Sequence, residues 1–113
     1  MFAIALAALT LAPWNGGDLP TATQAAAKFR LTVSGRPGHT VHLHTSGVSQ
    51  GWIAAFCDTK VCSPSQVSER IPASGKVIVQ FELIRETDDA PHSSGATIVS
   101  SDGARIVVPR ATR

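Results

Sequence analysis

Residues Lys76–Arg85 read KVIVQFELIR, the stretch that decides the fold class most clearly. Its odd-numbered positions are apolar from Val77 to Leu83, while Gln80 and Glu82 interrupt the even-numbered series. An apolar residue at every second position is typical of a β-strand that buries one of its faces. This stretch therefore predicts a long strand at the centre of a β-rich domain.

Six shorter segments on both sides of this stretch also predict strands. Clusters of Gly, Pro and Ser separate them, and these residue types favour turns. One separator is Ser101-Asp102-Gly103, and Asp-Gly is a strong hairpin signal. No amphipathic helical pattern follows residue 28. The six segments are 28–33, 41–44, 51–57, 66–71, 96–100 and 104–108.

Together these segments predict an all-β protein, a seven-stranded antiparallel β-sandwich, because their spacing is about ten residues. A small barrel is the alternative, since strand number alone does not decide closure. The expected domain covers residues 28–110 and residues 111–113 are expected to fray. The longest loop is expected between Glu86 and Gly95, which is polar and contains Pro91.

The composition is that of one folded domain. The chain has 113 residues, of which 43% are hydrophobic and 16% are charged. Ten Lys and Arg against eight Asp and Glu leave a net charge of +2. The arginines are dispersed along the sequence, whereas nucleic-acid modules concentrate basic residues in a patch. We therefore expect no nucleic-acid partner.

Residues 1–27 are predicted to be a signal peptide or a hydrophobic N-terminal segment. Residues 2–12 form an apolar run of signal-peptide length that is too short to span a bilayer, and the three alanines at 25–27 fit a cleavage site. No Lys or Arg precedes the run, so a short hydrophobic helix packed on the domain is the alternative. Export would place the domain in the periplasm or outside the cell, with no membrane span in the mature chain.

Two cysteines, Cys57 and Cys62, enclose four residues. An even cysteine number in an exported domain favours a disulfide. A bond between positions this close would fasten the end of the 51–57 strand to the following loop, contributing about 2 kcal/mol. One alternative is a zinc site, in which the two thiolates would supply half of the ligands and nearby histidines the others. Redox catalysis is the other, although its common motif is C-x-x-C at a helix start.

Three of the four histidines lie within six residues, at His39, His42 and His44, and His92 lies in the long loop. On a strand, His42 and His44 project from the same face, where both imidazoles could bind one Cu or Zn ion. His39 and His92 could supply further ligands. The simpler interpretation is that His42 and His44 face solvent, so no metal site and no cofactor are predicted, with Cu or Zn as the alternative.

The sequence predicts no enzyme, because phosphate-binding loops, nucleophile elbows and zinc-protease motifs are absent from it. Glu86, Asp88 and Asp89 could collect calcium, but they lack the spacing of a recognised calcium loop. We expect these carboxylates to belong to a solvated loop.

The stretch from Trp52 to Cys62 resembles a Trp-x4-Cys-Asp-x3-Cys pattern of immunoglobulin-like (Ig-like) domains in exported bacterial proteins. The following residues 71–75 and the long alternating strand are also similar to the layout of these domains. The resemblance implies an Ig-like sandwich and a disulfide between Cys57 and Cys62. It also implies an accessory domain with a supporting, spacing or adhesive role. It implies no catalytic residues.

The expected function is thus that of a non-catalytic exported structural or interaction module whose partner is another exported protein. A small periplasmic protein that binds Cu or Zn through the His-x-His strand is the alternative.

Overall fold

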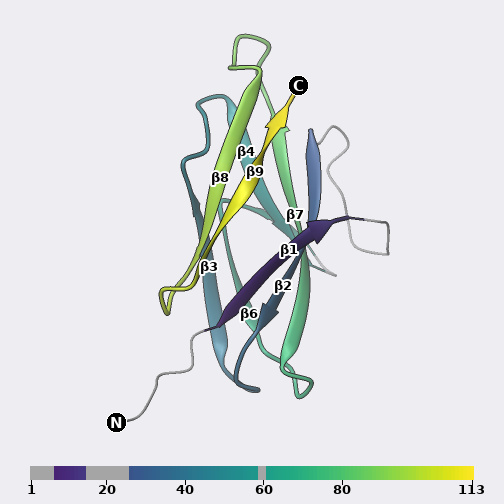
Figure 1. Cartoon of the computed structure of the whole chain (residues 1–113), viewed down its shortest axis with the longest axis vertical. Coiled ribbons are helices and arrows are strands. Elements are labelled where there is room, and N and C mark those ends of the chain that lie inside the picture. Colours follow the sequence, from purple (N-terminus) through teal and green to yellow (C-terminus); the bar gives the residue numbers. More distant parts are fainter. Residues whose placement is uncertain (1–6, 15–25, 59–60) are drawn as a thin grey trace.

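The computed structural model describes residues 7–14, 26–58 and 61–113. Strands in these ranges form two antiparallel sheets that pack face to face (Figure 1), so the fold is an all-β sandwich. None of the described residues belongs to a helix long and apolar enough to cross a membrane.

The larger sheet has five strands, with β7 at its centre. Hydrogen bonds join β7 to β2 on one side and to β4 on the other, and β1 and β5 form the two edges. In order across the sheet, the strands are β1 (Ala8–Pro13), β2 (Ala27–Ser34), β7 (Lys76–Arg85), β4 (Trp52–Cys57) and β5 (Cys62–Pro64).

The smaller sheet has four strands, with β6 and β9 at its edges. The pairing of β8 with β9 shifts register between Ser94 and Ala96, and Pro109 lies on β9 opposite this irregularity. In order across the sheet, the strands are β6 (Gln66–Arg70), β3 (Thr40–Ser46), β8 (Ser93–Ser100) and β9 (Arg105–Thr112).

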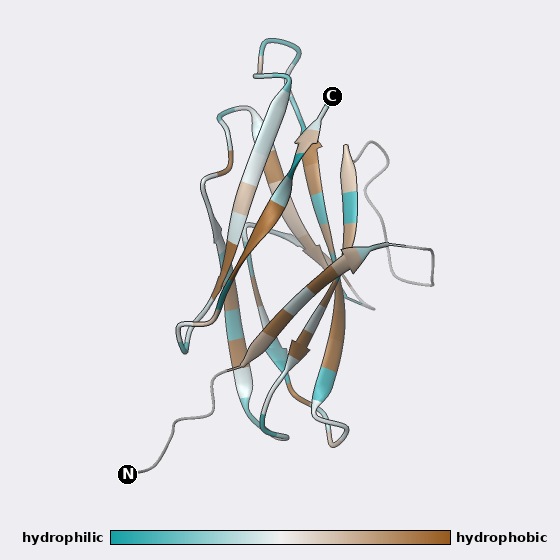
Figure 2. Ribbon diagram, in the orientation of Figure 1, coloured by the Kyte–Doolittle hydropathy of each residue, from teal (hydrophilic) through white to brown (hydrophobic). Residues whose placement is uncertain are grey.

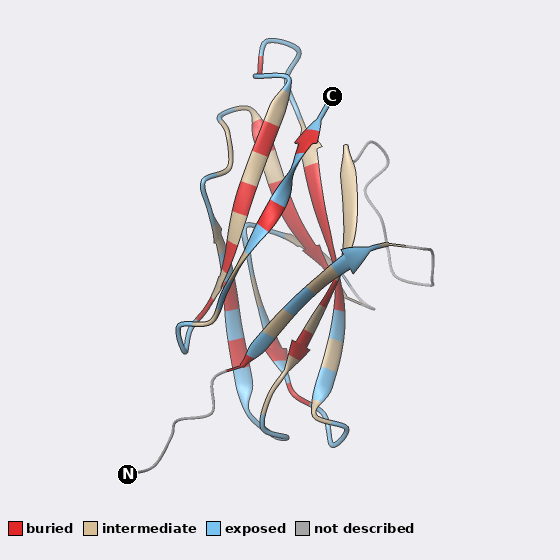
Figure 3. Cartoon of the chain, viewed as in Figure 1, coloured by how far each residue is buried: buried red, intermediate tan, exposed pale blue. Residues whose placement is uncertain are grey.

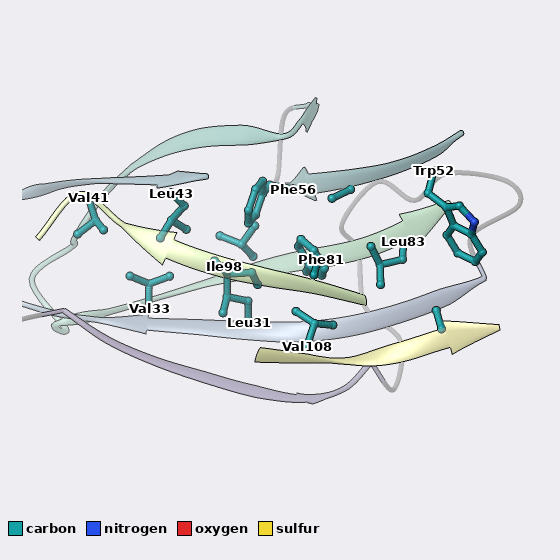
Figure 4. Packing of buried hydrophobic residues seen from close by; sticks show 14 of the residues in the cluster. Leu31, Val33, Val41, Leu43, Trp52, Phe56, Phe81, Leu83, Ile98 and Val108 are labelled. Carbon is teal, nitrogen blue, oxygen red and sulfur yellow. The ribbon is translucent and has the colours of Figure 1, made fainter. Parts of the chain in front are cut away.

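The core lies between the sheets and is built from alternate residues of their strands (Figure 4). Along β3, hydrophobic and hydrophilic residues alternate (Figure 2), and buried and exposed residues alternate in step (Figure 3). Phe56 and Phe81 pack edge to face with ring centroids 5.1 Å apart. The predicted inward face of the central strand is confirmed, since Val79, Phe81 and Leu83 are fully buried.

The prediction of seven strands is wrong, because the described residues form nine. Strand β1 lies within residues 1–27, which were expected to be a signal peptide or a hydrophobic N-terminal segment. The alternative of a packed helix is wrong for this part, since residues 8–13 pair with β2 along their whole length. Alternate apolar residues at Leu9 and Leu11 pack against the core, so this run has the period of a strand. Strand β5 has three residues, too few for an alternation to be recognised.

Several boundaries also differ from the expectation. β8 begins at Ser93, inside the predicted long loop, and β9 continues through Pro109 to Thr112. Ala111 is buried, which gives the end of β9 a packing contact that the sequence did not indicate. Most of the predicted signal peptide (residues 1–6 and 15–25) lies outside the described residues, as does the first alanine of its cleavage site.

Gln80 and Glu82 project from the outward side of β7, yet both are fully buried. The Gln80 amide Nε2 donates a hydrogen bond to the Glu82 carboxylate. Alternation indicates the face on which a side chain lies but not what covers that face, so it did not predict this burial.

Candidate functional site

The two cysteines form a disulfide across a hairpin. Cys57 ends β4 and Cys62 begins β5, and these two residues are direct partners in the antiparallel pairing. The Val61 amide donates to Asp58 Oδ1 at 3.0 Å, and the Asp58 amide donates to the Val61 carbonyl at 3.0 Å. The disulfide and this turn fix the position of Asp58 at the end of β4.

Asp58 forms a carboxyl pair with Glu69 of β6. The outward residues of β6 are exposed, but Glu69 faces the interior and is 9% exposed. Burial, the charge of Asp58 and a hydrogen bond with Asp58 raise the pKa of Glu69 to about 7. Glu69 is therefore partly protonated at neutral pH, at a point where the β4–β5 hairpin of one sheet meets the edge strand of the other.

His42 and His44 project from the exposed face of β3, as the sequence predicted. His42 Nδ1 lies 2.6 Å from the Ser68 hydroxyl on β6, and a shallow hollow is lined by both histidines together with Gln66 and Ser68. The contact with Ser68 fixes the orientation of the His42 ring and leaves Nε2 available to a ligand.

The other two histidines do not complete a metal site with this pair. His39 lies in the turn before β3, and His92 precedes β8 with Nδ1 3.0 Å from the Arg113 carbonyl. In the described ranges, no three His, Cys, Asp or Glu side chains come close enough to hold a metal ion together.

The loop between β7 and β8 is fixed by hydrogen bonds to its backbone. Arg85 Nη2 donates to the carbonyls of Asp88 and Ala90 at 2.7 and 2.6 Å, and Trp52 Nε1 donates to the Pro91 carbonyl at 2.6 Å. Gly51 lies directly beneath, where an added Cβ would be 2.5 Å from the Ala90 Cβ. These contacts explain how the polar segment that was predicted to be the longest loop is held in place.

The outer face of the smaller sheet gathers cationic and imidazole side chains that are scattered in the sequence. Arg70 of β6 and Arg105 and Arg110 of β9 are exposed there, together with the two histidines of β3. Sequence reasoning missed this grouping, because alternation indicates which side chains share a face but not which strands are neighbours. We name this surface the Arg–His face, comprising His42, His44, Arg70, Arg105 and Arg110.

Comparison of the chain with protein-family models, with curated proteins and with solved structures gave no significant match.

Proposed function

We propose that the chain is a non-catalytic, Ig-like module of an exported protein and that it acts through its surface. The strand order is the observation that carries this proposal. If β1, β2, β3, β4, β7, β8 and β9 are lettered A to G, the two sheets have the orders A-B-E-D and C-F-G. These are the strand orders of an immunoglobulin constant-type sandwich, with β5 and β6 as additions between the fourth and fifth strands.

The disulfide supports export to the periplasm or the extracellular space, because such bonds persist in oxidising compartments. It differs from the bond typical of immunoglobulin domains, which joins the two sheets across the core. Mass spectrometry of protein isolated from the producing cells tests this part of the proposal. A disulfide-bonded chain in the exported fraction is expected, and a cytosolic chain with two free thiols would contradict export.

Two exposed apolar side chains allow a direct test of surface-mediated function. Val107 is 74% exposed on the outer face of the smaller sheet, and Ile78 is 45% exposed on the larger sheet. A photo-crosslinking amino acid placed at either position should leave the fold intact. We expect a discrete adduct with another exported protein from position 107 in the producing organism and none from position 78. Absence of adducts at both positions would contradict the proposed function.

A second candidate function, binding of Cu or Zn by the His-x-His strand, is favoured by the contact between His42 and Ser68. A hydrogen-bonded second nitrogen is typical of metal-ligating histidines. Titration with Cu(II) and Zn(II) tests this function. Sub-micromolar binding that is lost in His42→Ala/His44→Ala and kept in His39→Ala/His92→Ala would support it, and unchanged binding in the first variant would contradict it.

A further inference from the structure

The register of the smaller sheet brings residues from all four strands into one outward row. Gln66 pairs with His44, His44 pairs with Val99, and Val99 pairs with Arg105. Val107 lies two residues further along β9 on the same face, opposite Thr97. The middle of this face is thus occupied by β-branched side chains, with cationic and imidazole groups around them.

No carboxylate projects outward from these four strands. The single acidic residue on them is Glu69, which faces the interior. Asp102, in the turn between β8 and β9, is directed away, since its Oδ2 accepts a hydrogen bond from the Ala7 amide at 2.6 Å. The remaining described acidic residues lie in β7, in the turn after β4 and in the loop before β8.

The guanidinium groups of this face keep most of their hydrogen-bonding capacity for a partner. Arg110 Nη2 donates to the Ser93 hydroxyl at 3.0 Å, which holds this side chain over the sheet. Within the described part of the chain, Arg70, Arg105 and Arg110 form no ion pair. Arginine offers a planar array of donors that matches carboxylate geometry.

We propose that the Arg–His face docks an acidic surface of another exported protein, an inference that rests on the proposed function. Charge complementarity defines the class of partner, since the face holds three arginines and no carboxylate. The apolar centre at Val99 and Val107 fits the dehydrated middle of a protein interface. The face carries no Phe, Tyr or Trp side chain, and large aromatic rings are the usual stacking platforms for single-stranded nucleic acids.

Binding of poly-L-glutamate to the full chain at low ionic strength tests this inference. The test variant is Arg105→Gln/Arg110→Gln, and the matched control is Arg36→Gln/Lys76→Gln, which changes the net charge equally at exposed positions off the face. We expect the test variant to weaken binding about tenfold and the control less than about twofold, with the difference lost in about 0.5 M salt. Circular dichroism verifies that both variants fold.

Equal weakening in both variants would overturn the inference, because the net charge rather than the face would then determine binding. Absence of binding would overturn it as well. Stronger binding to polygalacturonate or to anionic lipid vesicles than to polyglutamate would assign the face to a different partner class and would also overturn it. Adducts from position 107 without polyglutamate binding would overturn the acidic partner while leaving the proposed function intact.

Discussion

Glu69 is the residue whose environment departs most from what its position in the sequence suggests. An alternating edge strand places it on the inward side, where an apolar residue is expected, and Asp58 of the other sheet meets it there. A carboxyl group that keeps its proton at neutral pH can donate a hydrogen bond to an ionised partner. The pair therefore joins the two sheets most favourably when the two carboxyl groups share one proton.

This arrangement predicts a pH dependence of stability. The pKa of Glu69 is about 7 in the folded protein and about 4.5 in the unfolded chain, so its contribution is fully present below pH 4.5 and is lost as the pH rises through 7. Glu69→Gln, which mimics the protonated form, should raise the free energy of unfolding by about 1 to 2 kcal/mol at pH 8 and change it little at pH 4.5. Urea titrations at both pH values measure this difference, and an equal effect at both would contradict the pKa assignment.

Gly51 is a position where the backbone and the packing both require glycine. Its φ is +84°, and an added Cβ would clash with Ala90 and Thr87. Gly103 has a similar φ of +97° with open space around it, so Gly103→Ala is a matched control. We expect Gly51→Ala to cost about 3 kcal/mol and Gly103→Ala about 1 kcal/mol in thermal or urea unfolding. Equal costs would show that the loop over Gly51 yields to the added methyl group.

At the scale of elements, the disulfide is expected to act locally. The disulfide closes a short loop between adjacent strands, so it lowers the entropy of the unfolded chain only slightly. Its loss should therefore cost about 2 kcal/mol of stability. Reductant should lower the free energy of unfolding by this amount and speed amide exchange in β5, while the pairing of β4 with β7 persists. Complete unfolding on reduction would contradict a local role.

The attachment of β1 depends on the hydrogen bond between Asp102 and the amide of Ala7, the residue directly before this strand. The pKa of Asp102 lies below its ordinary value: burial alone would raise it, but hydrogen bonds from the Ser100 hydroxyl and from the Ala7 and Ala104 amides outweigh that effect. Asp102→Ala should therefore speed amide exchange in β1 by about tenfold. Asp89→Ala removes the same charge from an exposed loop and serves as control, and equal exchange in both variants would argue against this anchor.

The same anchor should weaken in acid. A lowered pKa in the folded state means that the contribution of Asp102 is present above its ordinary pKa and is lost as the pH falls through the folded value. As the pH falls through the folded pKa, exchange in β1 should thus approach that of the Asp102→Ala variant measured at the same pH.

The sequence predicted elements where alternation was long and clear, and it failed where another signal competed. The run of alternating residues in β7 identified a buried strand correctly. In β1, Leu9 and Leu11 also alternate, but Ala8 and Ala12 beside them are apolar too, and a largely apolar run is common to signal peptides and strands. The predicted segment 104–108 ended before Pro109, but proline is tolerated on an edge strand, where its missing N–H faces away from the sheet, and β9 continues to Thr112.

At the scale of the whole molecule, the candidate surface required the order of the strands, which no local pattern contains. The sequence predicted that His42 and His44 share a face, and the structure agrees. It could not predict that Arg70 and Arg105 lie on the same face, because β6 and β9 are distant in the chain and flank β3 and β8 only in the folded sheet.

The sheet order also predicts a gradient of local stability. β7 has hydrogen-bonded neighbours on both sides and its central residues are buried, whereas β1 and β9 each have one hydrogen-bonded neighbour. Amides from Val79 to Leu83 should therefore exchange only through global unfolding, and those of β1 and β9 through smaller openings. Native-state hydrogen exchange measures this gradient, and equal protection in β9 and β7 would contradict it.

The irregular edge formed by β9 has a consequence for behaviour at high concentration. Fibril growth needs a continuous row of backbone donors and acceptors that a further chain can extend. Pro109 removes one donor from this row, and the shifted pairing between Ser94 and Ala96 twists the edge. β9 carries Val107, which is 74% exposed, yet its irregular edge makes it a poor template for the addition of a further strand.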